Sequence, residues 1–386
     1  MPARRRPRSA SPGRSAADGP GRRRGARPEL RPGDGSVTER DELATSGLTV
    51  LHPGAWTTVQ DLGRLGLRSR GVPPGGAFDS QSHELANALA GNPPGAATLE
   101  LVLLGGKFRA DGPLAVALAG APMPARVLSG SGSRTVLPPI GFGLLPGDVL
   151  ELGGLPSGAR TYLAVRGGWR TPIVSGSRSS ERPLREGERI PALPSSSPIR
   201  RPRPCLLAIP GQEGLPIRII EGPDAELLVD RDWHQNPFVV SSESDRMGLR
   251  LDGPPIQVRT PPDRPSIPVL PGGIQVSGGR PILLGVAAGT MGGYPLVAVV
   301  ASADLPRLAQ ARPRDVLRFA PISLAEARRL DRESRRARRG ILLRLEAAVG
   351  GAGTLADPER RPPGSGPSAE GEPSDRNRPC RGREDG

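Results

Sequence analysis

Cysteine is almost missing from this 386-residue chain, which contains only Cys205 and Cys380. Cys380 lies in a polar stretch near the C-terminus, so a framework of disulfides is not expected. The three histidines, His52, His83 and His234, stand far apart and lack the spacing of metal ligands. The sequence therefore predicts neither a disulfide-rich fold nor a preformed protein metal site.

Lysine is also scarce, because Lys107 is the only one and nearly all of the formal charge of +14 comes from arginine. Residues 1–40 hold 11 arginines and 4 acids, and residues 328–386 hold 14 arginines and 10 acids. The remaining residues therefore carry a net charge of only +3. Abundant arginine with abundant alanine, glycine and proline is typical of a GC-rich coding sequence. We expect no specific nucleic-acid binding by the middle of the chain.

Long apolar runs are missing as well. The longest runs, residues 114–121 and 295–301, fall far short of the roughly 18 residues that span a bilayer. The arginines at positions 4–6 are not followed by the apolar segment of a signal peptide. We therefore expect a cytoplasmic protein that does not enter a membrane.

Glycine and proline, by contrast, are abundant, with 53 and 47 residues. Between residues 47 and 320 they separate short apolar runs, as turns do in a many-stranded β protein. Towards both ends they lie among arginine, serine and glutamate without apolar periodicity. We predict that residues 1–46 are a disordered basic extension, or sequence upstream of the true start, and that residues 341–386 are a disordered tail.

The apolar runs predict strands in two groups. The expected strands are residues 48–51, 99–104, 114–118, 149–152 and 161–165, followed by 217–220, 238–240, 282–284 and 296–300. A linker rich in proline, serine and arginine, residues 191–204, separates the groups. The sequence thus predicts a mainly β protein with short helices and two barrel-like halves, residues 47–190 and 205–340.

Two helices are predicted from their capping residues. Asp79 is placed to cap the start of one helix, and Gly91 is placed to end it. Ser323 and Glu326 form a capping box for a last helix that runs to about residue 339. Asp79 is therefore interpreted as a helix cap rather than as a catalytic acid. A cap can still serve a site, because the helix N-terminus that it fixes attracts anions.

Several polar residues have both a structural and a functional interpretation. Asp61 and Arg64 lie three residues apart, so they either form a local ion pair or belong to a site. Arg178 stands among glycine and serine residues, which leave room for its guanidinium to bind a carboxylate or phosphate. Asp245 and Arg246 either stabilise a turn or contribute to a site.

The glycine-rich loop at residues 289–295 also has two interpretations. Successive backbone N–H groups in such a loop can bind an anion. A loop of this composition is equally typical of a simple turn between two strands.

The order and spacing of the polar segments resemble a known family. The segments are residues 57–64, 75–79, 87–92, 160–168, 176–180, 244–248, 273–276, 292–295 and 303–305. Together they resemble the family known as biotin-dependent carboxyltransferase, allophanate hydrolase subunit 2 or the C subunit of 5-oxoprolinase. The resemblance covers roughly residues 47–327 and implies two cyclophilin-like β-barrel subdomains, at residues 47–190 and 205–340.

The resemblance implies an enzyme subunit that pairs with a partner of the allophanate hydrolase subunit 1 type. The pair is expected to use ATP, with magnesium, to activate the amide of 5-oxoproline or a similar small amide. A third component is expected to complete the ring opening to glutamate.

The resemblance also implies roles for individual residues. Arg64 and Arg178 are expected to neutralise charge in the transition state, and Thr290, the third expected catalytic residue, is expected to orient the amide together with Gln60. The other residues expected to bind substrate or nucleotide are Gln60, Asp61, Asp79, Asp245, Arg246, Gly292, Gly293 and Tyr294.

Two alternatives stay open. The first is carboxyl transfer from carboxybiotin to urea or another acceptor, with biotin delivered in trans because the sequence shows no biotin-carrier segment. The second is a non-catalytic binding or regulatory role. It is suggested by Ala287 and Gly289, which stand where the family usually has an aspartate and a glutamine.

Overall fold

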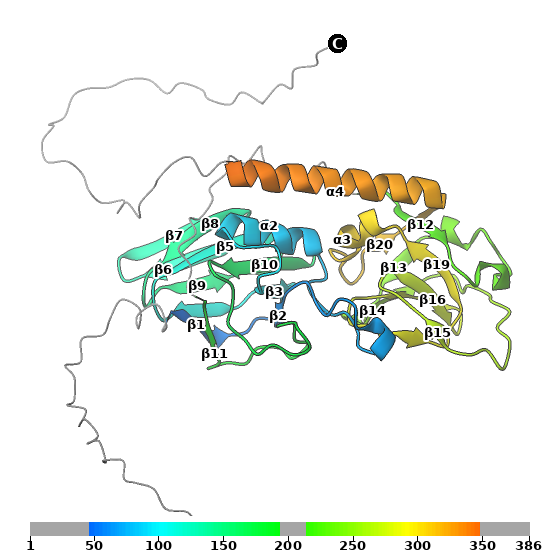
Figure 1. The fold of residues 1–386 in the computed structure, drawn as a ribbon, viewed down its shortest axis with the longest axis horizontal. Coiled ribbons are helices and arrows are strands. Elements are labelled where there is room, and N and C mark those ends of the chain that lie inside the picture. The colour runs from blue at the N-terminus through cyan, green and yellow to red at the C-terminus, as the bar shows by residue number, and fades with distance from the viewer. Residues whose placement is uncertain (1–45, 194–213, 348–386) are drawn as a thin grey trace, which may run out of the picture. The chain divides into compact units, whose positions relative to one another are not determined.

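A computed structural model describes residues 46–193 and 214–347 of the chain (Figure 1). The predicted basic extension, most of the predicted linker and residues 348–386 lie outside the described residues.

The first half is built from two antiparallel sheets. Its strands are β1 (Gly47–His52), β2 (Trp56–Gln60), β3 (Thr98–Val102), β4 (Lys107–Ala110), β5 (Leu114–Gly120), β6 (Ala125–Ser129), β7 (Gly132–Val136), β8 (Ile140–Leu144), β9 (Val149–Leu152), β10 (Arg160–Val165) and β11 (Arg189–Pro191). One sheet has the order β11-β1-β4-β9-β6-β7 and the other β2-β3-β10-β5-β8. Leu48 and Phe108 of the first sheet share one core with Leu99 and Leu163 of the second.

Helix α2 (Ser80–Ala90) covers the other face of the five-stranded sheet. Its buried Ala86 and Leu89 pack with Tyr162 and Ala164 of β10. The predicted caps are confirmed, because the Asp79 carboxylate accepts hydrogen bonds from two backbone N–H groups of the first turn and Gly91 ends the helix with φ of 78°. A short 3-10 helix, η1 (Arg68–Arg70), precedes α2.

The second half is organised around one eight-stranded sheet. Its strands are β12 (Ile217–Glu221), β13 (Phe238–Val240), β14 (Gly248–Asp252), β15 (Ile267–Pro268), β16 (Gly273–Ser277), β17 (Arg280–Leu284), β18 (Met291–Gly292), β19 (Leu296–Val300), β20 (Val316–Leu317) and β21 (Phe319–Pro321). The sheet order is β20-β13-β14-β17-β16-β19-β12-β21, while β15 and β18 form a separate ribbon. The sheet curls into a nearly closed barrel around Ile219, Phe238, Leu251, Ile274 and Leu283. The predicted mainly β, barrel-like fold is therefore confirmed.

Short helices connect these strands. They are η3 (Ala225–Leu227), η4 (Trp233–Gln235), η5 (Ser302–Asp304) and α3 (Leu305–Leu308).

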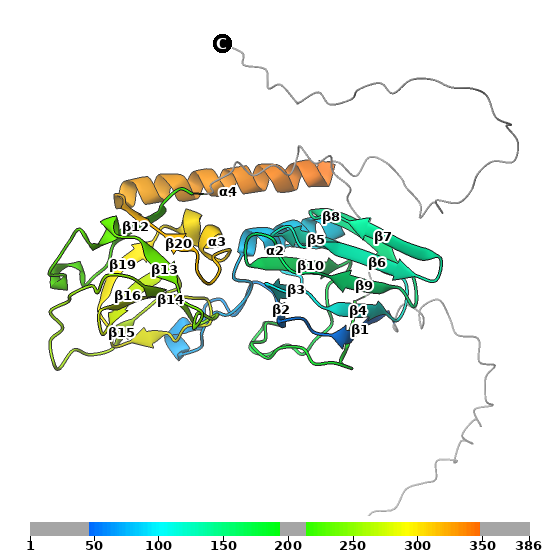
Figure 2. The same ribbon diagram turned by 180° about the vertical axis from the view of Figure 1, so that it is seen from behind.

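The last helix, α4 (Leu324–Ala347), is longer than predicted. Its start is confirmed, because Ser323 Oγ accepts a hydrogen bond from the Glu326 N–H at 3.1 Å. The predicted end near residue 339 and the predicted tail from residue 341 are wrong, and α4 is not a short helix. The reason is packing: Ile341 and Leu345 join the apolar cluster of α2, and this burial stabilises the last turns. Figure 2 shows α4 alongside α2.

The first half also continues further than predicted. Pro191 belongs to β11, and Ala192 is buried and pairs with Trp169. The predicted start of the linker at residue 191 is therefore too early, because the backbone there pairs with the six-stranded sheet.

Candidate functional site

Asp61 anchors the serine-rich loop that follows position 176. Its carboxylate accepts hydrogen bonds of 2.6 Å from Ser177 Oγ, Ser179 Oγ and the Arg178 N–H, and one of 2.7 Å from the Gly63 N–H. Burial opposes ionisation, but these four hydrogen bonds hold the pKa of the Asp61 carboxyl below its ordinary value. A local ion pair with Arg64, one of the two interpretations of the sequence, is not among the ion pairs of the described residues.

Arg178 lies within this loop, and Arg64 contacts it. Arg64 Nη2 donates to the Ser179 carbonyl at 2.6 Å, and Arg178 Nη1 donates to the Thr171 carbonyl. Both side chains are half-buried, and neither forms an ion pair within the described part of the chain. A guanidinium has five N–H donors, so each retains donors for an anionic ligand.

Gly63 lets the loop at residues 72–76 approach Arg64. It adopts φ of 81°, and a Cβ there would lie 2.4 Å from the Pro74 carbonyl oxygen. The Arg64 N–H donates to that same carbonyl at 2.7 Å, and the Gly75 N–H donates to the Val286 carbonyl at 2.9 Å. This last contact brings the loop of the second half that contains Ala287 next to the loop of Arg64.

Gln60 is fully buried beside the same loop. Its Nε2 donates to Thr58 Oγ1 and to the Ser180 carbonyl, both at 2.9 Å. In this structure Gln60 holds the serine-rich loop in place, and orientation of an amide substrate stays a prediction.

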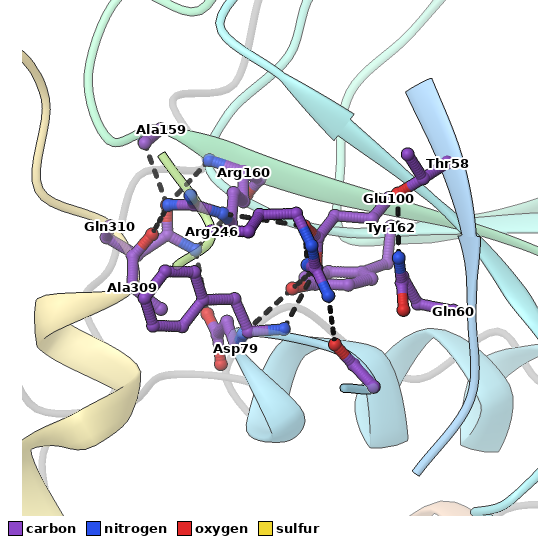
Figure 3. Close-up of polar contacts among 12 residues, drawn as sticks. Thr58, Gln60, Asp79, Glu100, Ala159, Arg160, Tyr162, Arg246, Ala309 and Gln310 are labelled. Atoms are coloured by element: carbon purple, nitrogen blue, oxygen red, sulfur yellow. Dashed lines mark hydrogen bonds and ion pairs between the residues drawn. The ribbon is translucent and has the colours of Figure 1, made fainter. Parts of the chain in front are cut away.

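Glu100 is the centre of a buried network that no motif in the sequence indicated (Figure 3). From β3, its carboxylate accepts hydrogen bonds from the Phe78 N–H at 2.9 Å, from Tyr162 Oη at 2.7 Å and from Arg246 Nη1. Arg160 Nε lies 3.6 Å away. Burial opposes its ionisation, but the two arginines hold the pKa of the Glu100 carboxyl low.

Arg246 belongs to the second half and joins this network of the first half. Besides Glu100, it donates from Nε to Glu181 Oε2 at 2.6 Å and from Nη2 to the Gly76 carbonyl at 2.6 Å. Its neighbour Asp245 is exposed and accepts hydrogen bonds from the N–H groups of Met247 and Gly248, two and three residues further on. The two residues therefore differ in role: Asp245 stabilises a turn, and Arg246 makes long-range contacts.

Asp79 is the second connection between the halves. Gln310 Nε2 donates to its carboxylate at 2.7 Å, and Gln310 Oε1 accepts from the N–H groups of Ala159 and Arg160, each at 2.9 Å (Figure 3). Burial raises the pKa of the Asp79 carboxyl, against the effect of its hydrogen bonds. Asp79 thus caps α2 and fixes Gln310.

The remaining predicted residues lie between β17 and β19, in and around the short strand β18. The Thr290 carbonyl accepts the Val269 N–H at 3.0 Å, and Gly292 pairs with Ile267. Gly293 and the exposed Tyr294 line a groove of about 440 Å³. No hydrogen bond between described residues joins this group to Arg64 or Arg178.

Sequence reasoning missed Glu100, Glu181, Tyr162 and Gln310. For Glu100 a signal existed, because it is the only charged residue in the apolar strand Thr98–Val102, and a buried carboxylate needs a partner. Its partner Arg246 is 146 residues away, and nothing in the local pattern could identify it.

Two further features, a membrane-spanning helix and a metal cluster, are not found in residues 46–193 and 214–347. No helix there is long and apolar enough to cross a membrane. No three side chains from histidine, cysteine, aspartate and glutamate come together in this part as a metal site would require.

Comparisons with known proteins agree on one family. A profile of the carboxyltransferase domain, subdomain A and B, matches residues 70–321. The chain is 34% identical over 306 residues to the C subunit of 5-oxoprolinase from Escherichia coli, covering 75% of this chain and 96% of that protein. It is 31% identical over 321 residues to urea amidolyase of Lachancea kluyveri, covering 73% of this chain and 17% of that protein.

The fold agrees with a solved structure of the same kind. The crystal structure of Kluyveromyces lactis urea carboxylase superposes with a TM-score of 0.69 at 28% identity, covering 76% of this chain and 29% of that one. The chain therefore corresponds to less than a third of that enzyme.

Proposed function

The chain belongs to the family of carboxyltransferase domains with subdomains A and B, and on that premise we propose that it is a subunit of an ATP-dependent 5-oxoprolinase. One observation carries the proposal. The match spans 96% of the bacterial 5-oxoprolinase component but only 17% of the urea amidolyase. The chain thus matches nearly the whole of the 5-oxoprolinase component and only one segment of the larger urea amidolyase.

The proposed site is the surface around the loop that Asp61 anchors. The four hydrogen bonds that the Asp61 carboxylate accepts fix the loop before any ligand arrives. Binding therefore loses little conformational entropy of the loop. Arg64 and Arg178 would then bind the anionic groups and neutralise charge that builds in the transition state. Thr290 would contribute from the neighbouring loop of the second half.

ATP would supply the phosphoryl group that activates the amide carbonyl. The two guanidiniums fit this anionic ligand, because they retain N–H donors and no described carboxylate neutralises them. Magnesium would arrive with the nucleotide, since such ions usually bind through substrate phosphates and few protein carboxylates. The proposed partners are a subunit 1 type homologue and a third, ring-opening component, all acting in the cytoplasm.

The test is reconstitution with both partner components and measurement of ADP release that depends on 5-oxoproline. Arg178→Ala should lower the rate at least about 10²-fold, as loss of a charge-stabilising donor typically does. Arg170→Ala is the matched control, because Arg170 lies on the same segment and is exposed. Equal rates for wild type and Arg178→Ala would contradict the assigned site.

A second candidate is carboxyl transfer to urea, favoured by the 31% identity to urea amidolyase. Biotin would then be delivered in trans on a separate carrier. Turnover that requires urea, bicarbonate and a biotinylated carrier, in the same assay supplied with a biotin carboxylase to make the carboxybiotin, would support this candidate over the first.

A further inference from the structure

The outer face of α4 carries a line of arginines. Arg328, Arg332, Arg336 and Arg339 are all exposed, and their spacing of four, four and three residues places them on one face of the helix. At 1.5 Å per residue the line extends about 16 Å. We call these four residues the arginine stripe.

The stripe has no neutralising partner among the described residues. The other arginines of α4 that form ion pairs use the nearby acids: Arg329 with Glu326 and Glu333, Arg335 with Asp331, and Arg338 with Glu84. No ion pair of the described chain includes a residue of the stripe. Its charge is therefore available to a ligand.

The opposite side of α4 is fixed to the protein. Leu345 is fully buried, Gln81 of α2 donates to Ser334 Oγ at 3.2 Å, and Arg338 pairs with Glu84 at 3.3 Å. The helix cannot turn the stripe inward without breaking these contacts. The backbone that carries the stripe is thus held in place before a partner docks, which lowers the entropic cost of docking.

An exposed leucine extends the same face. Leu343 follows Arg339 by four residues and is 53% exposed. A phosphate backbone offers no apolar surface to such a side chain, whereas protein interfaces combine arginine with apolar contacts. Arginine is also the cation best suited to bind carboxylates with two parallel hydrogen bonds. These features favour an acidic protein surface over a nucleic acid.

We propose that the arginine stripe and Leu343 dock an acidic surface of the subunit 1 type partner. This inference rests on the proposed function, which supplies the partner. It adds the surface through which the two proteins associate, on a helix away from the loop that Asp61 anchors.

The experiment measures binding of the full-length protein to the subunit 1 type homologue from the same genome, by isothermal titration calorimetry at 50 and 200 mM salt. The test variant replaces the four stripe arginines by glutamine, which preserves helix propensity. Loss of four charge pairs should weaken binding at least about tenfold at 50 mM salt, and higher salt should reduce the difference. The matched control replaces four exposed arginines elsewhere, Arg109, Arg250, Arg259 and Arg318. It should bind like the wild type.

Each other outcome contradicts a specific statement. Equal affinity of the stripe variant and the wild type overturns the docking surface while leaving the proposed function intact. Failure of the wild type to bind the homologue contradicts the proposed function and removes the partner named here. A 20-base-pair DNA duplex is added as a competitor at 150 mM salt. If the duplex displaces the homologue from the wild type and does not bind the stripe variant, the stripe is a phosphate-binding surface and the inference is overturned.

Discussion

Asp61 illustrates how a single carboxylate can organise a loop without a counter-ion. Its pKa is held below the ordinary value of 3.8, so its ionised form stabilises the fold at neutral pH. As the pH falls below 3.8, the unfolded chain binds a proton before the folded protein does, and this stabilisation is lost. Asp61→Asn should therefore show a shallower loss of stability on acidification. Urea unfolding at several acidic pH values measures the slope, and a slope equal to that of the wild type contradicts the role.

Ala287 and Gly289 stand where the resemblance implies an aspartate and a glutamine, so a catalytic defect is expected at these two positions. Gly289 has no positive φ, and an added Cβ would lie 3.5 Å from the Met291 carbonyl oxygen, an ordinary contact. Ala287→Asp with Gly289→Gln should therefore fold and raise ATP-dependent turnover of 5-oxoproline at least about tenfold, since a lost proton-transfer group costs about 10² to 10⁴.

The control for that experiment is Ala287→Asn with Gly289→Gln, which adds similar volume without a proton-transfer group. Wild-type turnover already at about 1 to 10³ per second would show that these two positions are not a defect.

Helix α4 shows at the scale of an element what the sequence could predict and what it could not. Its start follows from a local capping box, which depends on residues three apart. Its end depends on the packing of Leu345 against an apolar cluster of α2 and β10. The residues of that cluster lie more than 180 positions before Leu345 in the sequence. The last turns, residues 340–347, hold only four large aliphatic residues, and nothing local shows that they are ordered, because tertiary packing is what stabilises them.

The packing of Leu345 gives a direct test of this account. Leu345→Ala should lower the free energy of unfolding by about 3 kcal/mol, as expected for truncation of a fully buried leucine. Leu343→Ala is the control, since Leu343 is half exposed and should cost less than about 0.5 kcal/mol. Chemical denaturation of both variants provides the comparison, and equal losses would contradict the packing of the last turns.

At the scale of the whole molecule, the two β halves are joined by polar contacts of Arg246 and Gln310 with the first half. The two barrel-like halves could be predicted because strand and turn patterns are local. The contacts of Arg246 with Glu100 and of Gln310 with Asp79 could not, because each joins residues more than 140 positions apart. The prediction that Asp79 is a cap was correct but incomplete, since the same carboxylate also binds Gln310.

Glu100→Gln should destabilise the protein strongly. It leaves the Arg246 guanidinium buried without its main counter-charge, and breaking a buried ion pair costs about 3 to 5 kcal/mol. Glu181→Gln is a matched control, because Glu181 contacts the same guanidinium from a side chain that is 48% exposed and should contribute less than about 1 kcal/mol. Urea unfolding measures both, and similar effects would show that Glu100 is not the centre of the network.

The central claim, that this chain is a subunit of a 5-oxoprolinase, is tested most directly by substrate-dependent ADP release from the purified complex with its two partner components. The account predicts ADP formation that requires both 5-oxoproline and this chain, yields glutamate, and is insensitive to urea, bicarbonate and a biotinylated carrier. With a biotin carboxylase added to make carboxybiotin, ADP formation that requires urea and the carrier, with none above background on 5-oxoproline, would contradict it.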